Sequence, residues 1–230
     1  MNERTSPLRL DARLDEPLSR WLWLVKWLLL IPHYIVLFFL WIAFAVLTVI
    51  CFFAILITGR YPRTFFDFNV GILRWTWRVT AYGYGGLFTD RYPPFSLGEA
   101  EDYPAHLRVA YPERLSRGLV LVKWWLLAIP HYLVVALFSG AATGSDDWYS
   151  AGWYAIGLIG LLVLFAAIAL LFTARYPDGI FDFVMGMNRW SMRVAVYALL
   201  MSDRYPPFRL EQGGAEPAAQ DAVQEPSTPA

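Results

Sequence analysis

Two long stretches of the chain consist almost entirely of apolar residues. Residues 27–57 form 31 consecutive positions without a charged side chain, whereas about 20 apolar residues suffice to cross a hydrocarbon core of about 30 Å. The second stretch, residues 124–174, carries charge only at Asp146 and Asp147. Runs of this length are not needed in the core of a soluble domain, so the pattern predicts an integral membrane protein.

The two halves of the chain are related by an internal repeat. Three motifs return 97 or 98 residues later: Leu18-Ser-Arg20, Val25-Lys26-Trp27 and Ile31-Pro-His-Tyr34. Three more return 113 to 115 residues later: Arg60-Tyr-Pro62, Phe66-Asp-Phe68 and Asp90-Arg-Tyr-Pro-Pro-Phe95. The change of offset indicates an insertion of roughly seventeen residues in the second copy, and the polar stretch 139–147 has the composition of a surface loop.

The inserted loop suggests that each copy contains two transmembrane helices. The second copy then has spans near 117–138 and 152–173, and the first copy has spans near 19–39 and 42–58. The joint of the first copy, residues 39–42, contains no turn residue. A single long tilted helix, or a pair that dips without fully crossing, is therefore the alternative for the first copy.

The placement of basic residues favours the hairpins. None of the 19 Lys and Arg residues falls in a loop between the two helices of a hairpin. The positive-inside rule then places both termini and both post-hairpin regions in the cytoplasm. Two hairpins of the same orientation form a parallel repeat. The expected fold is an all-α integral membrane protein with two parallel tandem repeats.

The segments outside the repeats are short. We divide the chain into a cytoplasmic N-terminal segment (1–17), membrane repeat 1 (18–97), a linker (98–114), membrane repeat 2 (115–210) and a disordered C-terminal tail (211–230). Residues 8–10 and 106–109 alternate apolar and polar side chains, as half-buried strands do. These two segments are candidates for a pair of short strands.

A helix with a polar stripe is expected after each hairpin, over residues 64–87 and 179–201. The stripe contains Asp67, Gly71, Arg74 and Arg78 in the first copy and Asp182, Gly186, Arg189 and Arg193 in the second. The other faces are aromatic and apolar, which is typical of a helix in the membrane interface. Since guanidinium groups bind phosphate oxygens as a fork, the charged residues are candidates for binding lipid headgroups or a protein partner. The alternative is that the arginines pair with the aspartates and cap neighbouring helix ends.

Four polar residues fall within the apolar runs. Lys26 and Lys123 are the only lysines, and we expect their side chains to extend toward the cytoplasmic interface. His33 and His131 each follow a proline that should kink the helix and free a carbonyl. We expect the imidazoles to satisfy such carbonyls, and a proton or ion pathway is the alternative.

The sequence offers little chemistry. Cys51 is the only cysteine, so neither an intrachain disulfide nor a cysteine metal cluster can form. It contains no nucleotide-binding loop, no metal-ligand cluster and no nucleophile beside a base. We expect a non-enzymatic scaffold or accessory subunit without cofactor or nucleic acid, whose partners are membrane lipids and a membrane protein or a second copy. The alternative is a small transporter or channel with a pathway between the repeats.

Five motifs together resemble a known family. They are Ile31-Pro-His-Tyr34, Thr58-Gly-Arg-Tyr-Pro-Arg63, Phe66-Asp-Phe68, Arg74-Trp-Thr-Trp-Arg-Val79 and Thr89-Asp-Arg-Tyr-Pro-Pro-Phe95. The chain resembles an uncharacterised family of bacterial, chiefly actinobacterial, membrane proteins with domain of unknown function 4389, here in two tandem copies. The resemblance implies residence in the plasma membrane and supplies no established activity. Copy two departs from the pattern at Ala174 in place of Gly59 and at Asp178 in place of Arg63, which argues against equal duties for the two copies.

Overall fold

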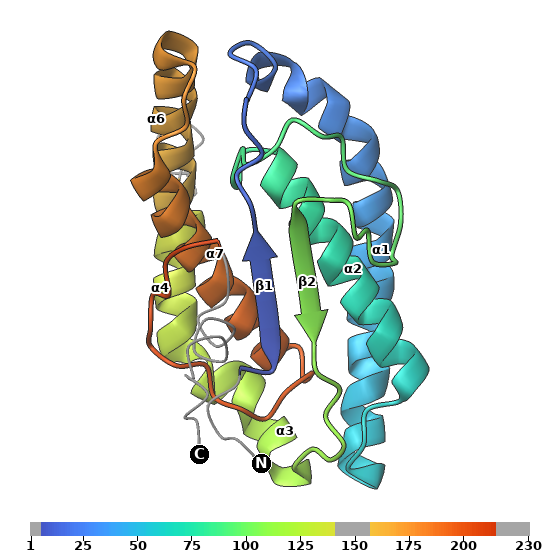
Figure 1. Cartoon of the computed structure of the whole chain (residues 1–230). Helices are drawn as coiled ribbons and strands as arrows, with labels where there is room; N and C mark the ends of the chain where they lie inside the picture. Colours follow the sequence, from blue (N-terminus) through green and yellow to red (C-terminus); the bar gives the residue numbers. More distant parts are fainter. Residues whose placement is uncertain (1–5, 141–156, 215–230) are drawn as a thin grey trace, which may run out of the picture.

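The computed structural model describes residues 6–140 and 157–214, and this part of the chain is mostly helical (Figure 1). Its elements, in order, are β1 (Leu8–Ala12), α1 (Trp23–Thr58), α2 (Arg63–Tyr82), β2 (Ala105–Val109), α3 (Arg117–Val122), the π-helical turn η1 (Lys123–Leu127), α4 (Ile129–Ser139), α6 (Leu158–Thr173) and α7 (Asp178–Ala198). Each half of the chain therefore contributes a strand, a long apolar helical column and a second helix, in the same order.

The first apolar run forms one continuous helix, α1, of 36 residues. The predicted hairpin of the first copy is therefore wrong, and the alternative of a single long helix describes it. The physical reason is that residues 39–42 offer no glycine, proline or polar side chain to end a helix. Pro32 lies inside α1, which curves near its start in Figure 1. The helix ends at Gly59, whose φ of 70° is the left-handed conformation that glycine favours.

The second apolar run forms a column of shorter helices. The helical run 117–127 meets α4 at an angle of 46°, just before Pro130. Figure 1 shows α6 continuing the column of α4 end to end, and Gly157 lies so close that a Cβ there would meet the backbone of Gly140. The predicted hairpin of the second copy would turn within 141–156, which lies outside the described residues. The described helices on either side of that segment stack as one column and correspond to α1.

The two strands pair as the alternation of residues 8–10 and 106–109 predicts. They form an antiparallel sheet in which Leu10 lies opposite Leu107. These two leucines are equivalent in the repeat, so a local twofold axis passes between them, perpendicular to the sheet. In Figure 1 α1 consequently runs downward while the column of α3, α4 and α6 runs upward. The predicted parallel relation of the repeats is wrong, because antiparallel pairing of equivalent strands inverts one copy relative to the other.

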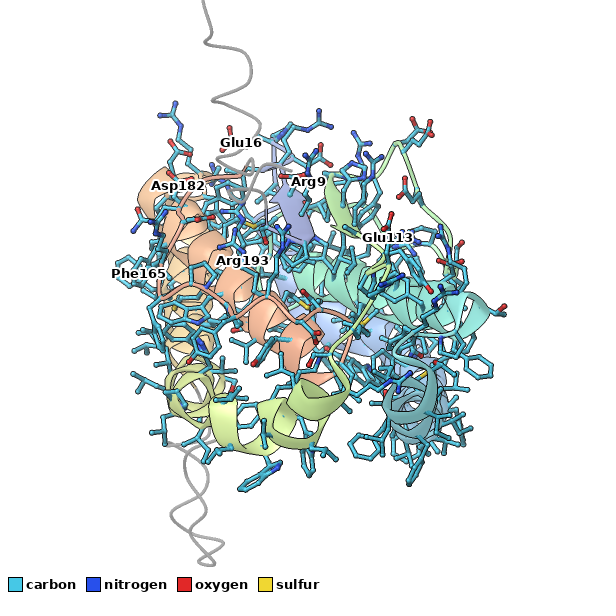
Figure 2. All side chains as sticks on the ribbon, turned by 90° about the horizontal axis from the view of Figure 1, so that it is seen from below. Arg9, Glu16, Glu113, Phe165, Asp182 and Arg193 are labelled. Atoms are coloured by element: carbon cyan, nitrogen blue, oxygen red, sulfur yellow. The ribbon has the colours of Figure 1, made fainter. Side chains whose placement is uncertain are left out.

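The strands are exchanged between the repeats. β1, from the first copy, packs on α7, and β2, from the second copy, packs on α2. In turn, α2 packs against α1, and α7 packs against α4 and α6. Three layers result: the sheet, the pair α2 and α7, and the long apolar columns (Figure 2). The predicted helix after each apolar run is confirmed as α2 and α7, and their placement in a membrane interface stays a prediction.

The described helices give limited evidence for a membrane span. By length and composition, α1 is the one helix in residues 6–140 and 157–214 that suffices by itself to cross a membrane. The bent pair formed by the run 117–127 and α4 would qualify together, and α6 is shorter, with 16 residues. The multi-pass topology expected from the apolar runs stays a prediction.

Candidate functional site

A buried lysine joins α1 to the loop that follows α2. Lys26 Nζ lies 2.9 Å from Asp90 Oδ1 and donates to the Thr89 carbonyl at 2.7 Å. The ammonium group also lies 4.5 Å from the centre of the Tyr82 ring. The other carboxylate oxygen of Asp90 accepts the backbone N–H of Ser19 at 2.5 Å. Lys26 does not extend toward an interface as expected, because this carboxylate holds its charge inside the protein.

The second copy repeats this arrangement. Lys123 Nζ donates to Asp203 Oδ1 at 2.7 Å and to the Ser202 carbonyl at 3.1 Å. Asp203 Oδ2 accepts the backbone N–H of Ser116 at 2.5 Å, and the ring centre of Tyr197 lies 5.7 Å from the ammonium nitrogen. Both lysines are therefore part of a lysine clamp, a buried ion pair that fixes an Asp-Arg-Tyr-Pro-Pro-Phe motif to the start of an apolar column.

A histidine clamp fixes the same motif about two turns further along. In the first copy, His33 Nδ1 accepts the indole N–H of Trp75 at 3.1 Å, and its ring stacks on Phe95 with centres 4.0 Å apart. Tyr92 packs against the same ring and donates its hydroxyl to the Leu29 carbonyl at 3.1 Å. The loop, rather than the imidazole, thus satisfies a carbonyl near Pro32.

The second histidine has the same surroundings. His131 Nδ1 accepts the indole N–H of Trp190 at 3.2 Å, and its ring stacks on Phe208 at 4.2 Å with Tyr205 beside it. Since an indole N–H points at Nδ1 in both copies, each neutral imidazole carries its proton on Nε2. Both imidazoles are fully buried and held in a fixed orientation.

The turn η1 keeps the two clamps of the second copy in register. Lys26 and His33 are seven residues apart, about two helical turns, but Lys123 and His131 are eight apart. A π-helical turn accommodates one extra residue, and η1 lies between Lys123 and His131. The turn therefore returns both side chains to one face despite the inserted residue, and it explains the change of offset from 97 to 98.

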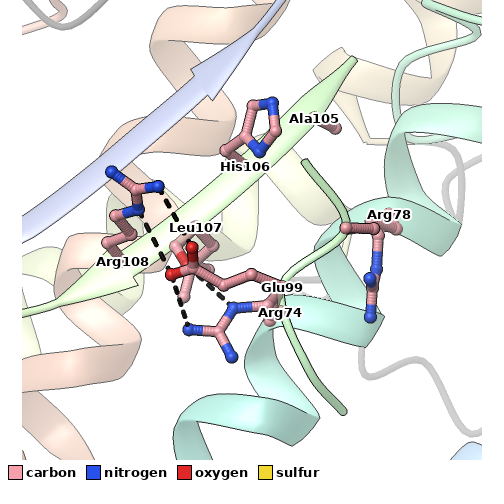
Figure 3. A pocket seen from close by; sticks show the side chains of 8 residues that line it. Arg74, Arg78, Glu99, Ala105, His106, Leu107 and Arg108 are labelled. Carbon is pink, nitrogen blue, oxygen red and sulfur yellow. Dashed lines mark hydrogen bonds and ion pairs between the residues drawn. The ribbon is translucent and has the colours of Figure 1, made fainter. Parts of the chain in front are cut away.

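The arginines of α2 bind backbone carbonyls of the linker and of β2 (Figure 3). Arg74 donates to the carbonyls of Leu107 and Leu97 at 3.2 and 3.1 Å and lies 3.3 Å from Glu99. Arg78 donates to the carbonyls of Gly98, at 3.2 Å, and Ser96. These guanidinium groups hold the chain that follows the Pro-Pro-Phe segment, and the hollow between them has a volume of only about 10 Å³.

Glu99 also contacts Arg108 of β2, as Figure 3 shows. Arg108 donates to both carboxylate oxygens of Glu99, at 3.2 and 3.0 Å. The hydrogen bond from Arg108 lowers the pKa of Glu99, with a smaller contribution from the charge of Arg74. This partly exposed network ties α2 to β2.

The arginines of α7 make the equivalent contacts with the chain end and β1. Arg189 donates to the carbonyls of Leu10 at 3.2 and 3.1 Å, Glu211 at 2.6 Å and Gly213 at 2.9 Å. Arg193 pairs with the Glu211 carboxylate. The predicted disordered tail therefore begins too early, because residues 211–214 are held by these arginines. Residues 215–230 lie outside the described residues.

The two aspartates of the predicted stripe do not join the arginines. Asp67 pairs with Arg63 at 3.5 Å on the exposed end of α2. Asp182 lies partly exposed near the start of α7. The acids of the stripe are thus separated from its arginines. Arg74, Arg78 and Arg189 donate to backbone carbonyls, and Arg193 pairs with a carboxylate, so these contacts favour a structural role for the four arginines over binding of headgroups.

Sequence reasoning missed the partners that complete both clamps. The ion pairs and hydrogen bonds of the clamps are made by Asp90, Asp203, Trp75 and Trp190, and spacing along the chain does not point to these residues. The signal that could have found them is repetition, because each clamp residue has an equivalent in the other copy: Trp75 matches Trp190, and Asp90 matches Asp203. The clamps contain no nucleophile next to a base, and their chemistry is that of ion pairing and hydrogen bonding.

The fold and these contacts define a class of two-repeat helical protein in which repeated polar motifs fasten each loop to an apolar column. The chain belongs to the family described as a domain of unknown function (DUF4389), whose profile matches residues 20–96 and 150–209. The two matches correspond to the two copies, and the second begins after the motif that contains Lys123 and His131. No curated protein and no solved structure matches the chain.

Proposed function

We propose that this protein is a non-enzymatic scaffold or accessory protein of the plasma membrane that lies along one face of the bilayer. Its apolar columns enter the acyl region, and its charged sheet layer faces the water, where a partner protein would bind. The following features of the described residues support this proposal.

The observation that carries it is the surface of α1. Its buried residues form a single stripe along the helix: Lys26, Leu30, His33, Leu37, Phe44, Cys51 and Ile55. The remaining faces expose large apolar side chains, among them Phe38, Phe39 and Ile57, with 63%, 64% and 72% of their surface accessible. An apolar surface of this extent is not stable in water and is typical of contact with lipid or another apolar chain.

The division between polar and apolar surface runs parallel to the columns. Figure 2, which looks along them, shows charged side chains such as Arg9, Glu16 and Glu113 on the sheet side and apolar side chains around α1 and α4. If α1 stood upright in the bilayer, the charged sheet beside it would lie at the depth of the acyl chains, at a high energetic cost. A 36-residue helix is also about 54 Å long, well beyond a core of about 30 Å. An orientation in the membrane plane avoids both problems.

The ends of the described chain favour the cytoplasmic side. The Ala12 N–H donates to the Gly214 carbonyl at 3.0 Å, so the N-terminal strand and the last described residues meet on the sheet side. Basic residues are concentrated outside the apolar columns, and the positive-inside rule associates such segments with the cytoplasm.

The transport alternative has less support. Each histidine is enclosed by aromatic residues of its own repeat, as His33 is by Trp75 and Phe95. Such packing favours a role in fastening loops over a role in a shared pathway.

The proposal is tested by native mass spectrometry of the full chain, extracted gently from its own membrane. We expect a stoichiometric complex with another protein. A bare chain, together with ion flux in proteoliposomes that is lost in a His33→Phe and His131→Phe variant, would overturn the scaffold proposal in favour of transport.

A further inference from the structure

A hollow of about 330 Å³ lies where the first repeat meets the second. It is lined by Thr58, Gly59, Arg60, Arg114, Leu115 and Arg117. The Leu115 N–H donates to the Gly59 carbonyl at 2.9 Å, which joins the end of α1 to the segment that enters α3. This hydrogen bond fixes the two walls of the hollow relative to each other.

The hollow is positively charged. Arg60, Arg114 and Arg117 are exposed, and no acidic side chain lines the hollow. Within residues 6–140 and 157–214, none of the three guanidinium groups forms a hydrogen bond or an ion pair. The carboxyl-terminal end of a helix attracts cations. Here the guanidinium groups do not donate to the last carbonyls of α1, so their N–H groups remain available to a ligand.

The position of the hollow suits a group that belongs at a membrane surface. Ile57, 72% exposed, directly precedes the lining residue Thr58 on α1, and Leu121, 48% exposed, lies about one turn after Arg117 on α3. The three arginines thus lie where the exposed apolar surface of α1 gives way to charged surface. The planar, fork-shaped guanidinium group binds two oxygens of a phosphate at once.

We propose that Arg60, Arg114 and Arg117 form a binding site for a phosphate ester, supplied by the headgroup of an anionic phospholipid or by a free phosphate compound. The site does not depend on the scaffold role. It also does not depend on how α1 is oriented in the membrane, because the end of α1 reaches the headgroup region in either orientation.

The second repeat provides an internal control. The positions equivalent to Arg60, Arg114 and Arg117 are Arg175, Pro17 and Arg20, so one arginine is missing. The nearby Arg63 is also replaced there, by Asp178. The three arginines therefore occur together at the end of α1, whereas the equivalent position at the end of α6 lacks one of them and should bind phosphate more weakly.

The test compares binding of phosphatidylglycerol and phosphatidylcholine to the full chain in detergent, by native mass spectrometry and titration. The triple variant Arg60→Gln, Arg114→Gln and Arg117→Gln should lose phosphatidylglycerol affinity by about tenfold or more. Binding of phosphatidylcholine should stay unchanged. The double variant Arg20→Gln and Arg175→Gln is the matched control and should change affinity by less than about threefold.

Competition identifies the source of the phosphate. Displacement of the lipid by millimolar glycerol 3-phosphate or inorganic phosphate would assign the site to free phosphate compounds, and its absence would assign it to lipid. Equal phosphatidylglycerol binding by the triple variant and the unaltered chain, or an equal loss in the control, would overturn the site. If the triple variant does not fold, Arg114→Gln alone carries the same comparison, because this exposed side chain has no partner in the described part of the chain.

Discussion

Leu10 and Leu107 occupy the same position in the two repeats and face each other directly across the β1–β2 pair. The carbonyl of each leucine accepts a hydrogen bond from an arginine of the other repeat: Arg189 donates to Leu10, and Arg74 donates to Leu107. The exchanged strands and these arginines therefore join the two copies into a single folded unit.

Arg189 should be essential for that unit. Its side chain is fully buried, and an Arg189→Gln substitution would leave several carbonyls without donors. We expect a loss of about 3 kcal/mol or more in the free energy of unfolding. Arg189→Lys should not restore it, because an ammonium group lacks the planar fork. Arg9→Gln, on the exposed face of β1, is the control, and similar unfolding curves for both glutamine variants in detergent would contradict the assignment.

The lysine clamps should be the next most sensitive sites. Asp203→Asn would leave the Lys123 ammonium buried without its counter-charge. We expect a cost of about 3 to 5 kcal/mol in unfolding experiments, whereas Asp67→Asn, which removes an exposed ion pair, should cost less than about 1 kcal/mol. Adding Lys123→Met to Asp203→Asn should recover part of the loss, and no recovery would argue against an unpaired charge as its cause.

Because η1 contains one extra residue, the fold should tolerate the deletion of one residue from this turn. Removing Trp125 would restore the seven-residue spacing of Lys26 and His33 to the second copy, so both clamps should still form on a regular helix. We expect a thermal midpoint within a few degrees of that of the unaltered chain, for a change of about 1 kcal/mol. Deletion of Leu133, by contrast, falls in the regular helix α4 and would rotate the residues beyond it relative to their partners. It should lower the thermal midpoint far more. Equal losses would show that η1 has no role in register.

The ion pairs of Glu99 should make the thermal stability of the chain depend on pH in the acid range. Because Arg108 lowers the pKa of this carboxyl, the ionised form is stabilised in the folded chain relative to the unfolded chain. Its contribution is complete above the ordinary glutamate pKa of about 4.3 and is lost as the pH falls through the lower folded value. The thermal midpoint should therefore fall more steeply below about pH 4.3 in the unaltered chain than in Glu99→Gln. Parallel curves would exclude this network as a source of acid sensitivity.

Much of the fold could be predicted from periodicity and repetition alone. The apolar runs, the strand pair and the helices α2 and α7 follow directly from residue patterns. The hairpin predicted for the first copy is wrong because an insertion in one copy does not require a turn in the other, and α1 runs without a break from Trp23 to Thr58. The orientation of the repeats depends on pairing between strands 97 residues apart, which no local pattern reports.

The candidate site was harder to predict for a related reason. Arg74 and Asp67 lie on one face of a helix, so pairing within the helix was a natural alternative. Instead, the arginines donate to the carbonyls of irregular segments such as Ser96–Gly98, and such acceptors carry no signature in the side-chain sequence. The lysine clamps involve residues 64 and 80 positions apart, beyond the reach of spacing rules.

The most direct test of an in-plane orientation is the sidedness of the two ends of α1. Single cysteines at the exposed positions Ser19 and Thr58, in a Cys51→Ala background, would be labelled with a membrane-impermeant maleimide in intact cells and in inside-out vesicles. If α1 lies in the membrane plane, both positions should be labelled from the cytoplasmic side and neither from outside. Labelling of one position from each side would show that α1 crosses the membrane and would contradict the proposal.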